Sequence, residues 1–297
     1  MHPFLLHNGE VHESSARLLE PGQVGLLNGW GVFSTLRVCD GVLFAFERHW
    51  ARMARDAKLL RVPMPWNAAA MERELMKLVE ANQALNATLR VVVVRNKGGA
   101  YQGPAIQSEV DLIAFTKELN HWGESATLGI QPQARHAQSA FAGTKMLSWS
   151  FNLVFYEQAI ASGFDEVVLL NERDEVSECT SANIFASQDD RVFTPPLTSG
   201  CLPGITRELL LDVVRAPGIT VEERSLRLED LERADGVFIT STTRDLLPVR
   251  RIEGLRIRQE SCALPLLRRA FSEYSRSYIS GRLPGAVLPS TRTSRIS

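Results

Sequence analysis

A dense run of β-branched residues constrains the fold of this chain more than any other feature. Residues 88–95 read TLRVVVVR, with four consecutive valines. Such a run is typical of a central strand that is covered on both faces of its sheet. A second strand is expected at 109–119, and stretches with helical spacing precede both strands at 47–60 and 67–85. The first part of the chain is therefore expected to combine a sheet with helices.

Two dipeptides predict tight turns in the N-terminal part. Asn8–Gly9 follows the strand-like residues FLLH, and Asp40–Gly41 divides residues 31–46 into the two arms of a hairpin. Both dipeptides suit two-residue hairpin loops, because the central positions of such loops have positive φ. We expect each to join two antiparallel strands.

The periodicity of the chain is lost around residues 120–134. A length of 297 residues allows one large domain or two modest ones. We expect a small N-terminal α/β domain at 1–118, a linker at 119–130 and a larger C-terminal domain at 131–280. The polar tail at 281–297 contains proline and glycine and is predicted to be disordered.

An apolar helix is expected directly after Lys145. Its apolar positions recur with helical spacing, which predicts a helix packed into the core. These positions are Leu147, Phe151, Val154, Phe155 and Ala159. Gly163 is expected to end the helix as the residue after its C-cap.

Composition excludes several classes of partner. The net charge is −1, so neither a nucleic-acid surface nor a polybasic membrane patch is indicated. No apolar run approaches the roughly 18–20 residues needed to span a bilayer, and the N-terminus does not resemble a signal peptide. The four cysteines show no CxxC spacing and the histidines no metal-ligand spacing. We therefore expect a cytoplasmic protein that binds small molecules and no metal.

Lys145 is one of only five lysines in the chain. Lys58 and Lys77 lie in the expected amphipathic helices, which suits solvated charges. A lysine can bind a carbonyl cofactor covalently, but only if its surroundings leave the amine partly deprotonated. Considered alone, Lys145 is more simply explained as an ordinary surface charge.

A spaced set of residues downstream changes that interpretation. The set consists of Glu178, Asn183, Phe185, Thr194, Gly204 and Arg207, in ECTSANIF, VFT and LPGITR. This spacing resembles the signature of the class IV aminotransferases, the fold-type IV enzymes that use pyridoxal 5'-phosphate (PLP). The resemblance runs from the first hairpin to about Val249. It implies a two-domain α+β or α/β fold like that of D-amino acid aminotransferases, and a homodimer with active sites near the interface.

The resemblance assigns the reactive end of PLP to Lys145 and Glu178. The cofactor aldehyde needs a lysine, and a carboxylate beside the pyridine nitrogen raises the pKa of that nitrogen and keeps it protonated. Without the signature, Glu178 would be explained as a solvated residue at the start of a strand. Ser181 and Ala182 are also expected to contact the cofactor. Many relatives carry a tyrosine where this chain has Trp149, whose indole N–H can donate but not accept, so Trp149 either contacts the cofactor or serves packing.

The phosphate of PLP needs backbone N–H groups at a helix start and a cation. Ile205 and Thr206 open the expected helix RELLLDVV and are suited to this role. Arg52 is the expected cation, because HWAR at 49–52 resembles the His-x-x-Arg of the family. By resemblance, Thr242 would contact the phosphate, and the backbone of Thr243 would meet a substrate carboxylate.

The strand at 32–38 is the main indication of the substrate. Alternation places Phe33, Thr35 and Arg37 on one face, which suits the wall of a cleft. The opposite face, with Val32, Leu36 and Val38, is expected in the core. Phe-x-Thr-x-Arg resembles the pattern of 4-amino-4-deoxychorismate lyases, and it also occurs in relatives described simply as aminotransferases. Arg90 lies in a similarly lyase-like stretch and is expected at the substrate.

Two enzymatic interpretations therefore remain open. The first is a PLP-dependent aminotransferase that moves an amino group between an amino acid, of branched-chain or D-amino acid type, and a 2-oxo acid. The alternative is a 4-amino-4-deoxychorismate lyase that releases pyruvate and 4-aminobenzoate. Lys145 would move the proton in both. A PLP-binding protein without turnover is the non-enzymatic interpretation.

Overall fold

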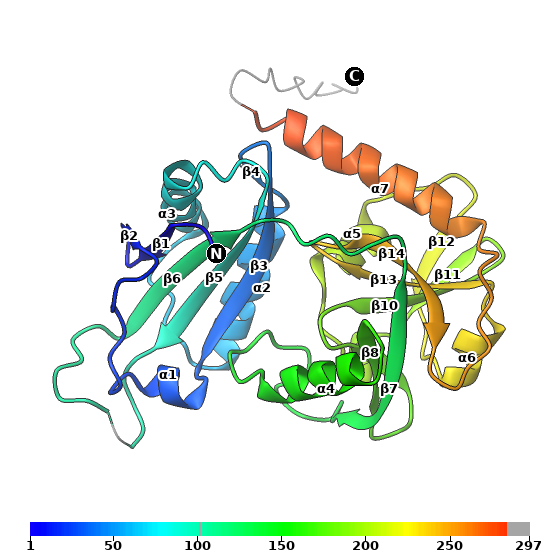
Figure 1. The fold of residues 1–297 in the computed structure, drawn as a ribbon, viewed down its shortest axis with the longest axis horizontal. Helices are drawn as coiled ribbons and strands as arrows, with labels where there is room; N and C mark the ends of the chain where they lie inside the picture. Colours follow the sequence, from blue (N-terminus) through cyan, green and yellow to red (C-terminus); the bar gives the residue numbers. More distant parts are fainter. Residues whose placement is uncertain (101, 284–297) are drawn as a thin grey trace, which may run out of the picture.

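The computed structural model describes residues 1–100 and 102–283 and contains two sheets, one in each half of the chain (Figure 1). The N-terminal sheet has the order β2-β1-β6-β5-β3-β4, and its neighbours are antiparallel. Its strands are β1 (Phe4–His7), β2 (Glu10–Glu13), β3 (Gly31–Cys39), β4 (Val42–Leu43), β5 (Ala87–Arg95) and β6 (Val110–Lys117). Its helices are α1 (Val24–Asn28), α2 (Phe46–Leu59) and α3 (Ala68–Ala81). The predicted strand at 88–95 is confirmed as the central strand β5, which lies between β6 and β3.

The core of the N-terminal domain lies between this sheet and the helices α2 and α3. Helix α2 packs on β3, and α3 packs on β1 and β6. The predicted inward face of β3 is confirmed, because Val32, Leu36 and Val38 are fully buried in this core. Burying a side chain of this size stabilises the fold by about 1.5–3 kcal/mol. The opposite face of β3 is thereby left to face the C-terminal domain.

Both predicted turns are present. His7 pairs with Glu10 and Cys39 pairs with Val42, so Asn8–Gly9 and Asp40–Gly41 are two-residue loops. All four loop residues have positive φ, between 49° and 89°. Asparagine, aspartate and glycine tolerate this left-handed conformation better than other residues do, which explains why the sequence signal was reliable here.

The C-terminal sheet is mixed and has the order β12-β11-β10-β13-β14-β7-β8-β9. Its strands are β7 (Ala126–Arg135), β8 (Glu166–Asn171), β9 (Val176–Cys179), β10 (Asn183–Gln188), β11 (Arg191–Thr194), β12 (Thr220–Glu223), β13 (Gly236–Ser241) and β14 (Asp245–Ile252). Its helices are α4 (Ser150–Ala161), η1 (Leu197–Ser199), α5 (Ile205–Asp212), α6 (Leu228–Arg233) and α7 (Ala263–Ser280). Strand β7 begins at Ala126, within the segment expected to be a linker, and lies parallel to both β14 and β8.

Helix α4 ends as expected but is not a core helix. Gly163 follows its C-cap with φ +80°, as the sequence predicted. The prediction that its apolar residues pack into the core was wrong for Phe151 and Val154, whereas Leu147 and Phe155 are half-buried against small apolar clusters. Phe151 is 75% exposed and Val154 is exposed, while Asn152 and Ala159 are buried. Apolar residues surround this helix on all sides, so burying one face against β8 leaves the others uncovered.

The C-terminal helix α7 lies across both halves of the molecule, running from the C-terminal sheet toward β4 (Figure 1). The ring of Phe44, just after β4, packs against Phe271 and Tyr278 of α7. The Tyr278 hydroxyl donates a hydrogen bond of 2.6 Å to Glu47 of α2. Aromatic packing and polar contacts to Glu47 therefore join the two domains at this edge.

The predicted disordered tail at 281–297 lies outside the described residues from 284 onward. Within residues 1–100 and 102–283, no helix has the length and apolar character needed to cross a membrane.

Candidate active site

A cavity of about 1380 Å³ lies between the two sheets. It gathers most of the residues singled out from the sequence, although they are far apart in the chain. Those in its wall are Phe33, Thr35, Arg52, Arg90, Lys145, Trp149, Glu178, Ser181, Ala182, Ile205, Thr206, Thr242 and Thr243. Of the residues expected to contact cofactor or substrate, Arg37 does not line this cavity, because it lines a separate, smaller one and forms an ion pair of 2.8 Å with Asp245.

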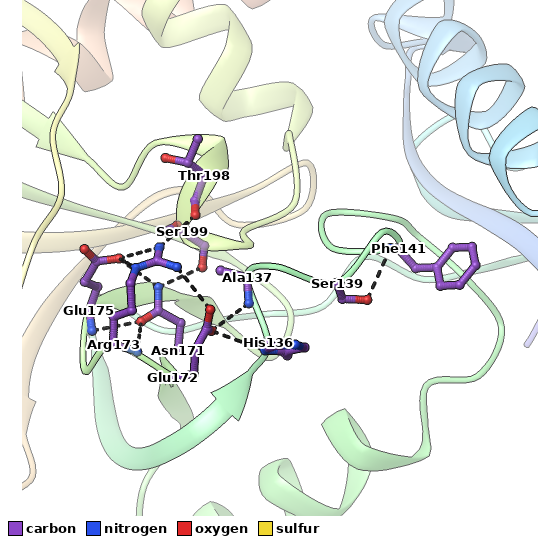
Figure 2. Close-up of polar contacts among 10 residues, drawn as sticks. All are labelled: His136, Ala137, Ser139, Phe141, Asn171, Glu172, Arg173, Glu175, Thr198 and Ser199. Carbon is purple, nitrogen blue, oxygen red and sulfur yellow. Dashed lines mark hydrogen bonds and ion pairs between the residues drawn. The ribbon is translucent and has the colours of Figure 1, made fainter.

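A loop that crosses between the domains carries Lys145. Near the start of the loop, the backbone N–H of Ala137 donates a hydrogen bond of 2.7 Å to Glu172. Figure 2 shows that Glu172 belongs to a polar cluster with Arg173 and Glu175, and that Phe141 lies apart from this cluster, farther along the loop. The loop is thus anchored on the C-terminal domain before it reaches Lys145.

The segment around Lys145 is also joined to the N-terminal sheet. Its carbonyl accepts a hydrogen bond of 3.1 Å from the N–H of Phe33, and Met146 forms an antiparallel bridge with Val32. The backbone N–H of Lys145 donates to Asp56 of α2 at 3.0 Å. The backbone of Lys145 is therefore fixed by β3 and α2 although it belongs to the second half of the chain.

The side chain of Lys145 has the protonation behaviour that covalent chemistry needs. Its Nζ lies 4.6 Å from the centre of the Phe33 ring. Burial, with a further contribution from the positive charge of Arg52, lowers the pKa of Lys145 from 10.5 to about 7. Close to neutral pH a large fraction of the amine is therefore uncharged and nucleophilic.

Arg52 is a buried cation with an unused donor. Helix α2 places it in the cavity wall, where Nη1 donates to the carbonyl of Pro203 at 3.1 Å and Nη2 to the hydroxyl of Ser34 at 3.1 Å. Burial lowers its pKa to about 10, so Arg52 stays charged at neutral pH. Its Nε is buried without a hydrogen-bond partner among the described residues. A buried donor left in this state is costly unless a ligand satisfies it.

The start of α5 supplies the other half of an anion site. The first N–H groups of a helix have no partner within the helix, and Ile205 and Thr206 are the first two residues of α5. The Thr206 hydroxyl is buried and has no partner in the part of the chain that the structure describes. Two unused polar groups, Thr206 Oγ1 and Arg52 Nε, thus belong to residues of the same cavity wall, and this arrangement fits the phosphate of PLP.

Asn183 and Gly204 hold the start of α5 in place. Asn183 donates from its side chain to the carbonyl of Leu202 at 2.8 Å. A Cβ on Gly204 would lie only 2.0 Å from the Asn183 side-chain oxygen, so the close approach requires glycine. Two residues of the sequence signature therefore shape the loop that precedes the helix.

Two further residues of the signature form polar contacts in the same region, outside the cavity wall. The Thr194 hydroxyl donates to the carbonyl of Ile184 at 2.9 Å. Arg207 is buried, donates to the carbonyl of Pro195 at 2.7 Å and pairs with Glu223. Neither residue lines the cavity wall, so their spacing in the sequence reflects support of the site.

Glu178 is held by a residue that the sequence analysis missed. Arg135, at the end of β7, donates from Nε to one carboxylate oxygen of Glu178 at 3.0 Å, and the N–H of Leu202 donates to the other at 3.1 Å. Arg135 also donates to Asn152 of α4, whose amide donates to the carbonyl of Thr180. Arg135 lies where the sequence shows no periodicity, and no local signal distinguishes it from a solvated charge.

A second missed residue, Arg244, fixes the segment around Ser181. Arg244 donates to both the carbonyl and the hydroxyl of Ser181 at 3.0 Å, and it forms a buried ion pair of 3.3 Å with Glu166. Its guanidinium carbon lies 3.7 Å from the centre of the Trp122 ring. Arg244 follows Thr243 directly, so this network connects the loop at 241–244 to the segment that contains Glu178.

The opposite wall combines an aromatic ring with cations. The guanidinium carbon of Arg90 lies 3.9 Å from the centre of the Phe33 ring, and burial lowers the pKa of Arg90. Trp149 meets the same ring edge to face, with centroids 6.2 Å apart. Thr35 lies on the same wall, two residues along β3. This wall offers apolar contact and a positive charge, a combination suited to an organic acid.

Comparison with known families decides the identity of this site. Residues 31–252 match the family model described as Amino-transferase class IV, and this range includes β3, the lysine loop and the whole of the signature. The chain belongs to the class IV aminotransferase family.

Curated and solved relatives agree with this membership. D-alanine aminotransferase of Bacillus licheniformis is 27% identical over 251 residues, which is 84% of this chain and 88% of that protein. A hypothetical aminotransferase from Mycobacterium tuberculosis, solved in its PLP-bound form, has a TM-score of 0.81 at 21% identity, covering 92% of this chain and 99% of that one. A provisionally named 4-amino-4-deoxychorismate lyase from Legionella pneumophila has a TM-score of 0.79 at 22% identity, covering 89% and 96%. The fold is that of the fold-type IV enzymes, and members of this family depend on PLP.

Proposed function

We propose that this protein is a PLP-dependent aminotransferase that acts on an amino acid of branched-chain or D-amino acid type and on a 2-oxo acid. The observation that carries the proposal is the composition of one cavity wall. It contains a lysine with a pKa of about 7, a carboxylate fixed by two hydrogen bonds, a cation with one unused donor, and a hydroxyl without a partner among the described residues. These groups suit the three parts of PLP that need a partner, which are the aldehyde, the pyridine nitrogen and the phosphate.

The chain would hold PLP at three points. Lys145 would bind the aldehyde, Glu178 would lie at the pyridine nitrogen, and Arg52 with the start of α5 would hold the phosphate. When bound, PLP supplies an electron sink for the bond that breaks. Lys145 Nζ would take the proton from the substrate carbon and deliver it again, which its lowered pKa favours. Glu178 would keep the ring nitrogen protonated.

The other wall would select the substrate. An amino acid and a 2-oxo acid both carry a carboxylate, which a half-buried arginine such as Arg90 or the backbone of Thr243 can bind. The Phe33 ring lines the cavity and adds an apolar group to this wall. Because one site must accept two substrates in turn, a wall with both features suits transamination.

The lyase alternative has one observation in its favour. Thr35 lines the cavity, so its hydroxyl could assist the release of pyruvate and 4-aminobenzoate from 4-amino-4-deoxychorismate. In a transaminase the same hydroxyl would only meet the substrate side chain.

We also propose that the chain works as a homodimer. Phe151, Leu153 and Val154 of α4 are exposed, and so are Leu26 and Leu27 of α1. The two helices are connected, because the Ser148 hydroxyl just before α4 donates to the carbonyls at the end of α1. An exposed apolar area of this kind is typical of a surface buried by a partner. Phe151 also lines the cavity, so a second copy seated here would lie beside the site.

The proposal is tested by adding candidate amino acids to the purified protein saturated with PLP and following the absorbance of the cofactor. Conversion of the cofactor to its amine form, with one equivalent of 2-oxo acid recovered, is expected. Pyruvate should be assayed in parallel after adding 4-amino-4-deoxychorismate without an acceptor. Catalytic pyruvate release in that assay would overturn the aminotransferase in favour of the lyase, and no turnover with any amine would overturn both.

A further inference from the structure

A second cavity, of about 210 Å³, lies between the two domains beneath α7. It is separate from the candidate active site and none of the roles proposed above uses it. Its wall consists of Arg37, Cys39, Phe44, Asp245, Leu246, Arg268, Phe271, Ser272, Ser275, Arg276 and Ile279. The N-terminal domain supplies the first three of these residues, and β14 and α7 of the C-terminal domain supply the others.

The charges in this wall are not balanced. Arg37 is paired with Asp245 through Nη1, at 2.9 and 2.8 Å to its two oxygens. Arg268 and Arg276 lie two turns apart on α7, and neither has an ion-pair partner within residues 1–100 and 102–283. Three arginines and one aspartate line the cavity, which is an excess of two positive charges, and Arg268 and Arg276 are exposed, so they lie at the solvent side of the wall.

Two polar atoms in the wall of the cavity are buried without hydrogen bonds to the described residues. One is Arg37 Nε, which the ion pair with Asp245 does not use, although the Arg37 side chain also interacts with the thiol of Cys39, and the other is the Ser275 hydroxyl. Buried donors in this state lose their hydration without compensation, so most such groups in proteins have a partner. Here the two atoms belong to different domains but line the same cavity.

We propose that this interdomain cavity binds a phosphate-type dianion, held by Arg37 Nε, Ser275 Oγ and the guanidinium groups of Arg268 and Arg276. A dianion matches the excess of two positive charges. Guanidinium groups bind the oxygens of phosphate through paired, charge-assisted hydrogen bonds, and a tetrahedral anion can accept from donors that approach from several directions. A monocarboxylate would leave one positive charge unbalanced.

Binding here would act on the candidate active site through Asp245. This residue pairs with Arg37, has positive φ, and directly follows the segment 241–244, of which every residue lines the large cavity. An anion that draws Arg37 toward itself weakens the hold of Arg37 on Asp245. We therefore expect bound phosphate to change the KM for a carboxylate substrate more than kcat.

The test uses the protein saturated with PLP, so that the cofactor's own phosphate site is filled. Inorganic phosphate is titrated by calorimetry at constant ionic strength, while the absorbance of the bound cofactor is monitored to exclude its displacement. One saturable site per chain is expected. The double variant R268A/R276A should weaken binding at least about tenfold, because it removes two charge-assisted contacts, and S275A should weaken it by a smaller factor. R269A, an exposed arginine on the same helix that does not line the cavity, is the matched control and should bind as the wild type does.

Three results would overturn the assignment. The first is the absence of saturable phosphate binding to the wild type, which would mean that water alone fills the cavity. The second is binding that survives in R268A/R276A. The third is competition by acetate as strong as competition by phosphate, which would contradict a site for a dianion. Because binding is measured directly, these results do not depend on which reaction the enzyme catalyses.

Discussion

At the scale of single residues, we expect the protonation state of Lys145 to determine when the protein can take up its cofactor. Its pKa of about 7 means that the amine is mostly protonated below pH 7 and mostly neutral above it. Only the neutral amine attacks an aldehyde. The rate at which the cofactor-free protein captures PLP should therefore rise between about pH 6 and 8 and then level off. Stopped-flow absorbance measures this, and a rate that keeps rising tenfold per pH unit up to pH 10 would indicate an unperturbed lysine.

Arg135 is expected to be a positioning residue for Glu178. Replacing it by leucine removes a charge-assisted hydrogen bond, worth about 1.5–3 kcal/mol, and leaves the carboxylate free to turn. Turnover in R135L should fall roughly tenfold to a hundredfold, with borohydride labelling of Lys145 by PLP retained. R135K should recover part of the loss, and adding R135L to E178Q should cause no further loss beyond that of E178Q alone. If R135L is as stable as the wild type and its turnover is also unchanged, a positioning role of Arg135 is excluded.

The two residues that the sequence missed show the limit of reasoning from spacing. The sequence could indicate Lys145 and Glu178 as candidates, because PLP requires a lysine, a carboxylate and a helix start in one chain and the signature resembles that of a known family; the structure places both in one cavity wall. Arg135 and Arg244 act through partners distant in sequence, Glu178 and Glu166. These contacts exist only because β7 lies between β14 and β8. No local pattern encodes that order of strands.

At the scale of elements, α4 shows that a helix can be predicted correctly from the sequence while the burial of its apolar side chains is predicted wrongly. Its length and its end at Gly163 follow from local chemistry. Its apolar spacing could not reveal whether the covering surface comes from the same chain or from another. The strand β5 and the two hairpin loops were easier to predict from the sequence. A run of valines and the Asn-Gly and Asp-Gly pairs each favour one conformation locally.

The proposed dimer gives a direct test of the exposed face of α4. Two glutamates in place of Val154 and Ile160, both exposed, should prevent burial of this surface by a second copy, because unpaired charges are costly to desolvate. Sedimentation should show a dimer for the wild type and a monomer for V154E/I160E. Q158E, an exposed polar position on the same helix, should remain dimeric. A wild-type protein that is fully active as a monomer would contradict the proposal.

At the scale of the whole molecule, α7 holds the two domains together. The Tyr278 hydroxyl donates to Glu47 across the domain boundary, at 2.6 Å. Y278F should lower the free energy of unfolding by about 1 kcal/mol, since Glu47 keeps its contact with Arg282 and with water. Y274F is the control, because the Tyr274 hydroxyl has no hydrogen bond to the described residues. Urea denaturation measures both, and equal effects of the two substitutions would remove any specific role of the contact.

The attachment of Lys145 to both domains also has a consequence for the newly made chain. During synthesis on the ribosome, Arg52 appears first, then Lys145 and Glu178, and finally Thr206 and Thr242. The backbone of Lys145 contacts Asp56 of α2, and Met146 beside it pairs with Val32 of β3, so we expect the lysine to reach its position only after β3 and α2 have folded. We therefore expect a reactive aldehyde such as PLP to be retained only by a nearly finished polypeptide. The yellow colour of the bound cofactor, followed during translation or refolding, would report the completion of the molecule and not the folding of either half.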